Sequence, residues 1–452
     1  MDSHADLLDD AAGRAREYLR SNTARRVAPV PAAVDALREL DEPFPESPTP
    51  PSEVLALLDR LGSPATVTTT GGRYFGFVNG GVLPAALAAS WLASTWDQNV
   101  SLRVMSPAGV AFEDVALRWV CEILGLPATG AGAIVTGATT ANFCGLAAAR
   151  HALLASAGWD VESDGLFGAP PLRVVVGEEV HISLLKALAL LGLGRRRVER
   201  VAVDGQGRMR VDALPDLDAR TIVCIQAGNV NSGAFDPAVE LCRRAHERGA
   251  WVHVDGAFGL WAAASPRYRH LTGGFGDADS WATDGHKWPN VGYDCGIAVV
   301  RHAAALRGAM VATSAYFAPG EHREPSQFSP EMSRRARGVE LWAALRSLGR
   351  QGLAALIERT AGHAARFAEG LRERGYEILN DVVINQVLVS FGSPAVTRAT
   401  VAKIQEDGVL WCGVTEWQGR TAMRISVSSW ATTDDDVRLS LEAIDRAARD
   451  VS

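Results

Sequence analysis

An aspartate at the end of an apolar run and a lysine in a later polar turn are the residues best suited to chemistry. Asp255 ends the run Trp251–Asp255, and Lys287 stands in the sequence Thr-Asp-Gly-His-Lys-Trp at 283–288. A lysine amine forms a Schiff base with an aldehyde, and a carboxylate holds a proton on a pyridine nitrogen. The pair therefore suits pyridoxal phosphate, whose protonated ring takes up the electrons of a carbanion. The alternative is a surface lysine and a strand-end acid that never meet.

A loop of small residues suits the phosphate group of such a cofactor. The segment Thr136–Asn142 follows the short apolar run Ala133–Val135 and precedes an alanine-rich helical stretch. Small residues let the backbone approach a phosphate, and a helix N-terminus offers free N–H groups with a partial positive charge. Thr139 and Thr140 add hydroxyl donors. An ordinary helix cap is the alternative.

Three further polar residues stand near Lys287 or after predicted strands. His181 follows an apolar run, where its imidazole could stack on a pyridine ring or only start a helix. Asn229 lies in the amide-rich segment Gln226–Gly233, where it could position the phenolic oxygen of the ring, or the substrate, or serve turn chemistry. His286 precedes Lys287 directly and is close enough to touch the phosphate or to move a proton.

Short β-branched runs alternate with helical stretches, which favours an α/β fold with a mainly parallel sheet covered on both faces. Ligands in such sheets bind beyond the carboxyl ends of the strands, and Asp255 and the Lys287 turn lie just after or just before such strands. The predicted strands are Ala133–Val135, Leu172–Val176, Thr221–Gln226, Ala250–Val254 and Gly296–Val300, and the predicted helices are Ala108–Leu124, Thr140–Ala157, Ser183–Leu191 and Pro237–Arg248.

The sequence predicts three parts. Residues 1–51 form an N-terminal arm and connector, because the proline-rich segment Pro43–Pro51 suits neither a helix interior nor a central strand. This arm could wrap a partner subunit or be a disordered tail. Residues 52–328 form a large cofactor-binding domain. Residues 329–452 form a smaller α+β domain, with a long helical run from Arg334 to Leu371.

Composition excludes several classes of protein. The chain has 452 residues, a formal net charge of −7 and no long basic run, so nucleic acid is a poor partner. Its six cysteines contain no C-x-x-C pair, which fits reduced thiols and neither a disulfide framework nor a metal site. The acidic N-terminus lacks the pattern of a signal peptide, and the apolar segment Leu83–Ala93 is too short to span a membrane. We expect a soluble, cytoplasmic protein.

Together these motifs give the chain a family resemblance. Over roughly residues 70–450 it resembles the fold-type I pyridoxal-phosphate enzymes of the group II amino-acid decarboxylase family. The His-Lys-Trp motif with a downstream Asp-Cys pair is specific to this class and argues against a plain aminotransferase. The segments that carry the resemblance are Thr136–Asn142, His181, Gly233–Pro237, Val252–Gly259, His286–Trp288 and Asp294–Cys295.

The resemblance implies a fold, a cofactor and a set of site residues. It implies the fold-type I transferase fold, with a mainly parallel seven-stranded sheet in the large domain and a smaller C-terminal α+β domain. It implies a homodimer with the active site at the interface, and an amino-acid substrate. The assigned residues are Lys287 for the Schiff base, Asp255 for the pyridine nitrogen, His181 for stacking on the ring, and Ala138, Thr139 and His286 for the phosphate.

Two features depart from the family pattern. The mobile loop of the family often carries a tyrosine that protonates the carbanion, and the segment Pro319–Gln327 has none. We predict that the loop Gly320–Gln327 closes over the site and that His322 is its best candidate for a proton donor. Asp284 stands where an asparagine is common, and its extra negative charge favours a protonated imine.

We therefore predict a pyridoxal-phosphate-dependent carboxy-lyase of amino-acid metabolism that releases carbon dioxide and an amine. One alternative keeps the cofactor but makes a carbonyl product, as in a carbon–carbon lyase of the aldolase type or an aminotransferase. Another is a catalytically silent binding module on the same fold. The sequence does not identify the amino acid. The clusters Tyr74–Phe77 and Trp96–Asn99 could line its side-chain pocket or only pack an interface.

Overall fold

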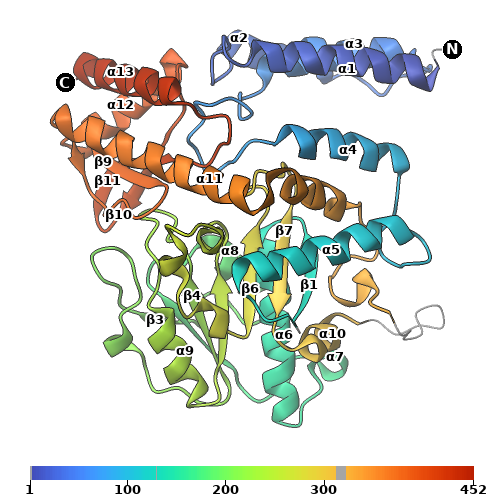
Figure 1. The fold of residues 1–452 in the computed structure, drawn as a ribbon, viewed down its shortest axis with the longest axis vertical. Helices are drawn as coiled ribbons and strands as arrows, with labels where there is room; N and C mark the ends of the chain where they lie inside the picture. Colours follow the sequence, from blue (N-terminus) through green and yellow to red (C-terminus); the bar gives the residue numbers. More distant parts are fainter. Residues whose placement is uncertain (1–2, 129, 312–321, 452) are drawn as a thin grey trace. The chain divides into compact units, whose positions relative to one another are not determined.

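The computed structural model describes residues 3–128, 130–311 and 322–451. Two compact units make up the chain (Figure 1). The first unit combines Met1–Gly81, Arg366–Leu379 and Leu388–Ser452, and the second combines Val82–Ala365 and Asn380–Val387. The domain boundaries predicted after residues 51 and 328 stay predictions.

A seven-stranded sheet forms the centre of the second unit, with the strand order β1-β7-β6-β5-β4-β2-β3. Only β7 runs antiparallel to its neighbours, β1 and β6, while the other pairs of this sheet are parallel. The predicted α/β class and mainly parallel sheet are therefore confirmed. The strands are β1 (Ala131–Val135), β2 (Arg173–Gly177), β3 (Glu199–Val201), β4 (Thr221–Gln226), β5 (Trp251–Asp255), β6 (Ser280–Asp284) and β7 (Gly296–Val300).

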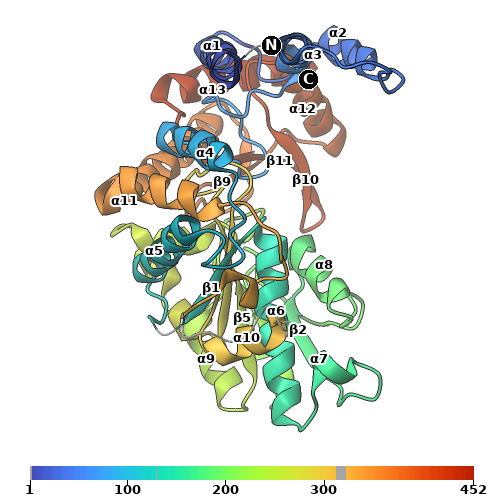
Figure 2. The ribbon, with the colours of Figure 1, turned by 90° about the vertical axis from the view of Figure 1, so that its right-hand side faces the viewer.

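Helices cover both faces of this sheet, which is why its central strands are buried throughout and mostly apolar. Figure 2 shows α6 and α8 on one side and α5 and α9 on the other. The helix α10 packs along α6. The bounds of these helices are α5 (Pro107–Leu124), α6 (Ala138–Ser156), α8 (Ile182–Leu190), α9 (Ala238–His246) and α10 (Ala303–Met310), and the short α7 spans Val161–Asp164.

A smaller antiparallel sheet has the strand order β10-β11-β9-β8. The helix α12 packs against β11 and α13. These observations agree with the small α+β part expected near the C-terminus. The elements are β8 (Glu377–Ile378), β9 (Gln386–Ser390), α12 (Pro394–Asp407), β10 (Gly413–Trp417), β11 (Arg420–Ser426) and α13 (Asp434–Val451). The long helical segment α11 (Arg337–Glu373) is broken at Gly349.

The N-terminal segment is helical on both sides of the proline-rich connector. The helices are α1 (His4–Ser21), α2 (Pro31–Ala36), a 3₁₀ turn at Leu37–Leu40, and α3 (Pro51–Ala65). Residues 41–50 form neither helix nor strand, as the prolines predict, and Pro51 occupies the first turn of α3. The next helix, α4, spans Pro84–Trp96. Among the described helices, none is long and apolar enough to cross a membrane.

Candidate active site

Two acidic residues end neighbouring parallel strands and so share one edge of the sheet. Asp255 is the last residue of β5, and Asp284 is the last residue of β6. Asp255 pairs in register with Ala282, so Asp284 extends beyond it toward the turn that contains Lys287. The topology therefore brings the lysine and the predicted ring partner to the carboxyl edge expected for a ligand.

Lys287 points its amine at a buried carboxylate. Its Nζ lies 3.3 Å from Oδ2 of Asp284 and 5.9 Å from the centroid of the Phe258 ring. The Lys287 side chain is 16% exposed, and that of Asp284 is 2% exposed. The amine is thus held beside Asp284 while the Lys287 side chain stays partly exposed.

Asp255 is buried, with polar neighbours on one side. Asn142 Nδ2 donates to Asp255 Oδ2 at 3.1 Å. Burial raises the pKa of Asp255, while the nearby charges of His181 and Lys287 and the Asn142 hydrogen bond act in the opposite direction. The residues predicted as the cofactor anchor, the stacking group and the ring partner therefore lie within electrostatic reach of one another.

The start of α6 has the features of a phosphate cradle, with one exception. Gly137 is the N-cap and makes no side-chain cap, so the helix start is open, and Thr139 lies half-buried in its first turn. A Cβ at Gly137 would stand 3.4 Å from His286 Cε1 and 3.6 Å from Asp284 Oδ1, so the backbone at the helix start lies close to both side chains. The exception is Asp284, whose Oδ1 accepts from the Ala138 N–H at 2.6 Å and so occupies one of the amides that a phosphate needs.

His286 lies beside this cradle. Its Nδ1 donates to the Cys295 carbonyl at 2.9 Å, and its ring stacks on Tyr293 with 4.4 Å between centroids. Its Nε2 lies 3.5 Å from Asp284 Oδ2. Burial lowers the pKa of His286, and Asp284 works against that shift. The structure thus brings His286 to Lys287 and Asp284, although adjacent turn residues need not face one pocket.

His181 and Asn229 have structural partners of their own. His181 is the N-cap of α8, and its Nδ1 accepts from the Ser183 amide at 3.3 Å. Asn229 donates to Glu179 Oε2 at 2.9 Å and accepts from the Asn231 amide at 2.8 Å. The helix-start and turn alternatives therefore describe real contacts of both residues. Their roles toward a cofactor stay predictions.

Part of the predicted mobile loop lies outside the described residues, which resume at His322 after residue 311. His322 itself is exposed. The sequence also has Tyr316 shortly before Pro319. Tyr316 is therefore a second candidate for a proton donor next to the segment Pro319–Gln327, and it too lies outside the described residues.

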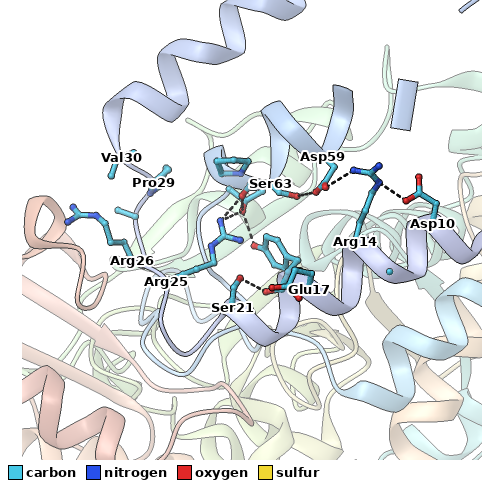
Figure 3. Close-up of a pocket in the computed structure, with 15 residues that line it drawn as sticks. Asp10, Arg14, Glu17, Ser21, Arg25, Arg26, Pro29, Val30, Asp59 and Ser63 are labelled. Carbon is cyan, nitrogen blue, oxygen red and sulfur yellow. Dashed lines mark hydrogen bonds and ion pairs between the residues drawn. The ribbon is translucent and has the colours of Figure 1, made fainter. Parts of the chain in front are cut away.

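A separate cavity of about 740 Å³ lies in the first unit, beside α1, the loop after it and the end of α3 (Figure 3). Several of its charged groups already have partners. Arg14 contacts both Asp10 and Asp59 at 3.0 Å, and Arg25 donates to the Ser63 carbonyl while lying 4.4 Å from the ring centroid of Tyr18. It has no lysine lining, so it does not suit the Schiff-base chemistry. Among the described residues, no cluster of histidine, cysteine or acidic side chains is arranged to hold a metal ion.

Most of the chain matches a known protein family. Residues 35–392 match the pyridoxal-dependent decarboxylase conserved domain. The chain is 25% identical to the acidic amino acid decarboxylase GADL1 of Mus musculus, over 85% of this chain and 75% of the relative. It is 27% identical to tryptophan decarboxylase 1 of Oryza sativa subsp. japonica (84% and 80% covered) and to L-2,4-diaminobutyrate decarboxylase of Rhizobium meliloti (81% and 76% covered).

Solved structures share the fold. The crystal structure of Oryza sativa TDC with PLP and tryptamine superposes with a TM-score of 0.91, covers 99% of this chain and 97% of that one, and is 23% identical in sequence. Mouse CSAD superposes with a TM-score of 0.89 at 22% identity, with 98% of both chains covered.

Proposed function

The chain belongs to the pyridoxal-dependent decarboxylase family, and from this premise we propose that Lys287 binds the cofactor covalently and that Asp255 is the partner of its ring nitrogen. The protein is an amino-acid decarboxylase of this family, and its cofactor is pyridoxal phosphate. One observation supports the proposed roles of Lys287 and Asp255 most strongly. Lys287 Nζ lies at the carboxyl edge of the sheet, 3.3 Å from Asp284 and within electrostatic reach of Asp255.

The residues present fit this cofactor. When bound, pyridoxal phosphate supplies an electron sink for the electrons that carbon dioxide leaves at Cα. Asp255 would hold a proton at the ring nitrogen. The first-turn amides of α6 and the Thr139 hydroxyl would bind the phosphate, with His286 beside them. His181 would cover a face of the ring, and Asn229 would orient the ring or the substrate. We also place the activity in the cytoplasm, because the cysteines are free thiols in the structure.

The substrate class is open among amino acids, because the named relatives act on acidic, aromatic and diamino compounds. The test is a panel of amino acids from these three classes, with amine, carbon dioxide and carbonyl products measured together. We expect at least one substrate to give amine and carbon dioxide in equal amounts. A carbonyl product as the main outcome would favour the lyase or aminotransferase alternative.

Asp284→Asn should bind the cofactor more tightly. The buried Asp284 carboxylate accepts from the Ala138 amide at the start of α6, so it both repels a phosphate and competes for its donor. An asparagine keeps an oxygen for the amide and removes the charge. We expect the Kd of pyridoxal phosphate for the cofactor-stripped protein to fall about tenfold, equivalent to about 1.4 kcal/mol.

The matched control is Asp164→Asn at the exposed end of α7, where the same loss of charge should leave the Kd unchanged. Titration of the visible absorbance measures both. Weaker binding by Asp284→Asn would mean that the negative charge holds Lys287 in place more than it opposes the phosphate.

Tyr316 and His322 are the two candidates for the proton donor in the loop segment, and their variants separate them. If Tyr316 protonates Cα, Tyr316→Phe should lower amine formation by about 10²–10⁴-fold and raise carbonyl by-products. His322→Phe should then leave the product ratio unchanged, since His322 is exposed. A loss of amine formation in His322→Phe, with unchanged products in Tyr316→Phe, would make His322 the donor. Unchanged products in both variants would leave His181, His286 or a bound water.

We propose that the protein is a homodimer. Among its described residues α1 buries none, and α4 exposes Trp91 at 41%, Leu92 at 56% and Trp96 at 42%. Large apolar side chains grouped on one helix mark an interaction surface more often than a solvated one. In the first unit, Leu58 of α3 is similarly 64% exposed.

Leu92→Glu should weaken this dimer. A charge in an apolar interface costs several kcal/mol when it has no partner, so the variant should sediment as a monomer at concentrations where the parent is a dimer. Leu190→Glu is the matched control, because Leu190 is an exposed leucine (64%, against 56% for Leu92) on another helix, α8. Analytical ultracentrifugation measures the oligomeric state of the parent protein and of both variants. A monomeric parent protein at all concentrations would end the dimer proposal.

A further inference from the structure

Four hydrogen bonds connect Asp255 to residues that have no assigned role. Asn142 Nδ2 lies 3.1 Å from Asp255 Oδ2, and Asn142 Oδ1 lies 2.8 Å from His253 Nε2. On the other side of its ring, His253 Nδ1 lies 2.8 Å from Ser280 Oγ, and Trp251 Nε1 donates to that oxygen at 2.9 Å. We call Asn142, His253, Ser280 and Trp251 the relay. All four are at most 6% exposed.

The fold itself aligns the relay. Trp251, His253 and Asp255 alternate along β5, so their side chains lie on one face of the sheet. Ser280 of β6 is the register partner of His253. The helix α6 covers this face closely, since a Cβ at Gly145 would come 2.7 Å from His253 Cε1.

The donor and acceptor groups of the relay set the direction of its hydrogen bonds. The indole of Trp251 can only donate, so Ser280 Oγ accepts from it and keeps its own O–H for His253 Nδ1. Burial lowers the pKa of His253 to about 3, so its ring is neutral. Because the Ser280 O–H donates to Nδ1, the single ring proton lies on Nε2. That N–H donates to Asn142 Oδ1, and the Asn142 NH₂ group then donates to Asp255.

The opposite direction leaves a group unsatisfied. If Asp255 Oδ2 carried a proton for Asn142, the amide would turn and His253 would donate from Nδ1 to Ser280. Ser280 would then accept from both His253 and Trp251, and its own O–H would lose its acceptor. A buried donor without an acceptor is costly, so the arrangement opposes a proton on Oδ2.

We propose that His253, Ser280 and Trp251 are positioning residues that act through Asn142 to keep the shared proton on the ring nitrogen of the cofactor and off Asp255. This inference rests on the proposed pairing of Asp255 with that nitrogen. The step involves only the position of one proton between the nitrogen and a carboxylate oxygen. The other ionisable groups that act on Asp255 are His181, Lys287, Asp284 and the thiol of Cys224, and none of them belongs to the relay.

The experiment is ¹⁵N solid-state NMR of the full-length protein loaded with pyridoxal phosphate labelled at the ring nitrogen. The variants are Ser280→Ala, which removes the hydroxyl, and His253→Leu, which removes both ring nitrogens. His253→Gln is the rescue, because its amide can donate to Asn142 and accept from Ser280. Val252→Ala is the matched control, since Val252 is buried on the opposite face of β5.

At neutral pH we expect the parent protein, His253→Gln and Val252→Ala to show the shift of a protonated ring nitrogen. Ser280→Ala and His253→Leu should move toward the unprotonated shift. An unchanged shift in Ser280→Ala, the smaller change and the one that best preserves the fold, overturns the inference. Asp255→Asn distinguishes a failure of the relay from a failure of the proposed pairing of Asp255 with the ring nitrogen. If it loses the proton while the relay variants keep it, only the relay is wrong; if it also keeps the proton, the proposed pairing of Asp255 is wrong as well.

Discussion

Lys287→Ala should abolish both the visible absorbance of the bound cofactor and turnover. Lys287 is the only lysine at the carboxyl edge of the sheet among the described residues, and its amine is 3.3 Å from Asp284. Without it, no covalent link forms, and we expect turnover to fall by on the order of 10⁴-fold or more, as for other covalent nucleophiles. Absorbance spectra and a decarboxylation assay measure the two effects.

The chain offers matched controls for this variant, because it has only two other lysines. Lys186 is exposed on α8, and Lys403 pairs with Asp407 at 3.0 Å on α12. Lys186→Ala and Lys403→Ala should keep the absorbance and the activity. Circular dichroism checks that Lys287→Ala remains folded, since the change leaves the buried Asp284 without its cation. If the folded variant still shows the Schiff-base absorbance, Lys287 is not the anchor.

Asp255→Asn should keep the cofactor and lose most of the activity. An amide cannot hold the proton on the ring nitrogen, so the electron sink weakens while the contacts at the start of α6 remain. We expect kcat/KM to fall by about 10²–10⁴-fold with little change in cofactor binding. Steady-state kinetics and titration of the cofactor separate the two quantities.

The stability of the same variant gives an independent check. Burial raises the pKa of Asp255, so above that pKa its ionised form costs folding free energy in the protein without cofactor. The amide removes this cost, and we expect the Tm of cofactor-free Asp255→Asn at neutral pH to equal or exceed that of the parent. Near-normal turnover would show that Asp255 is not the ring partner, and a large loss of Tm would show that its role is structural.

The pattern of the sequence predicts the sheet well because buried parallel strands are continuous apolar runs. The predicted strand Thr221–Gln226 has the observed bounds of β4. The strand β6 was not predicted, because Ser280, Thr283 and Asp284 give it a polar composition. Its serine hydrogen-bonds to Trp251 and His253, so burial is possible without apolar residues. Contacts of this kind depend on strands that are distant in sequence.

The candidate site is likewise predictable from the sequence only in part. Residue type, together with a position at the end of a predicted strand for Asp255 and in a polar turn for Lys287, was enough to propose these two residues. The alternation of Trp251, His253 and Asp255 also predicts that they share one face of a strand. No local pattern shows that Asn142 connects His253 to Asp255, or that Asp284 occupies the Ala138 amide. These contacts require the register of β5 with β6 and the close approach of α6.

Chemical trapping of the cofactor is the most direct test of the proposed Schiff base on Lys287. Borohydride reduces a Schiff base to a stable amine, so digestion and mass spectrometry then identify the lysine that carried the cofactor. We expect one modified peptide, with the cofactor mass on Lys287 and with Lys186 and Lys403 unmodified. A cofactor mass on Lys186 or Lys403, or no modified peptide from a protein that decarboxylates amino acids, would contradict it.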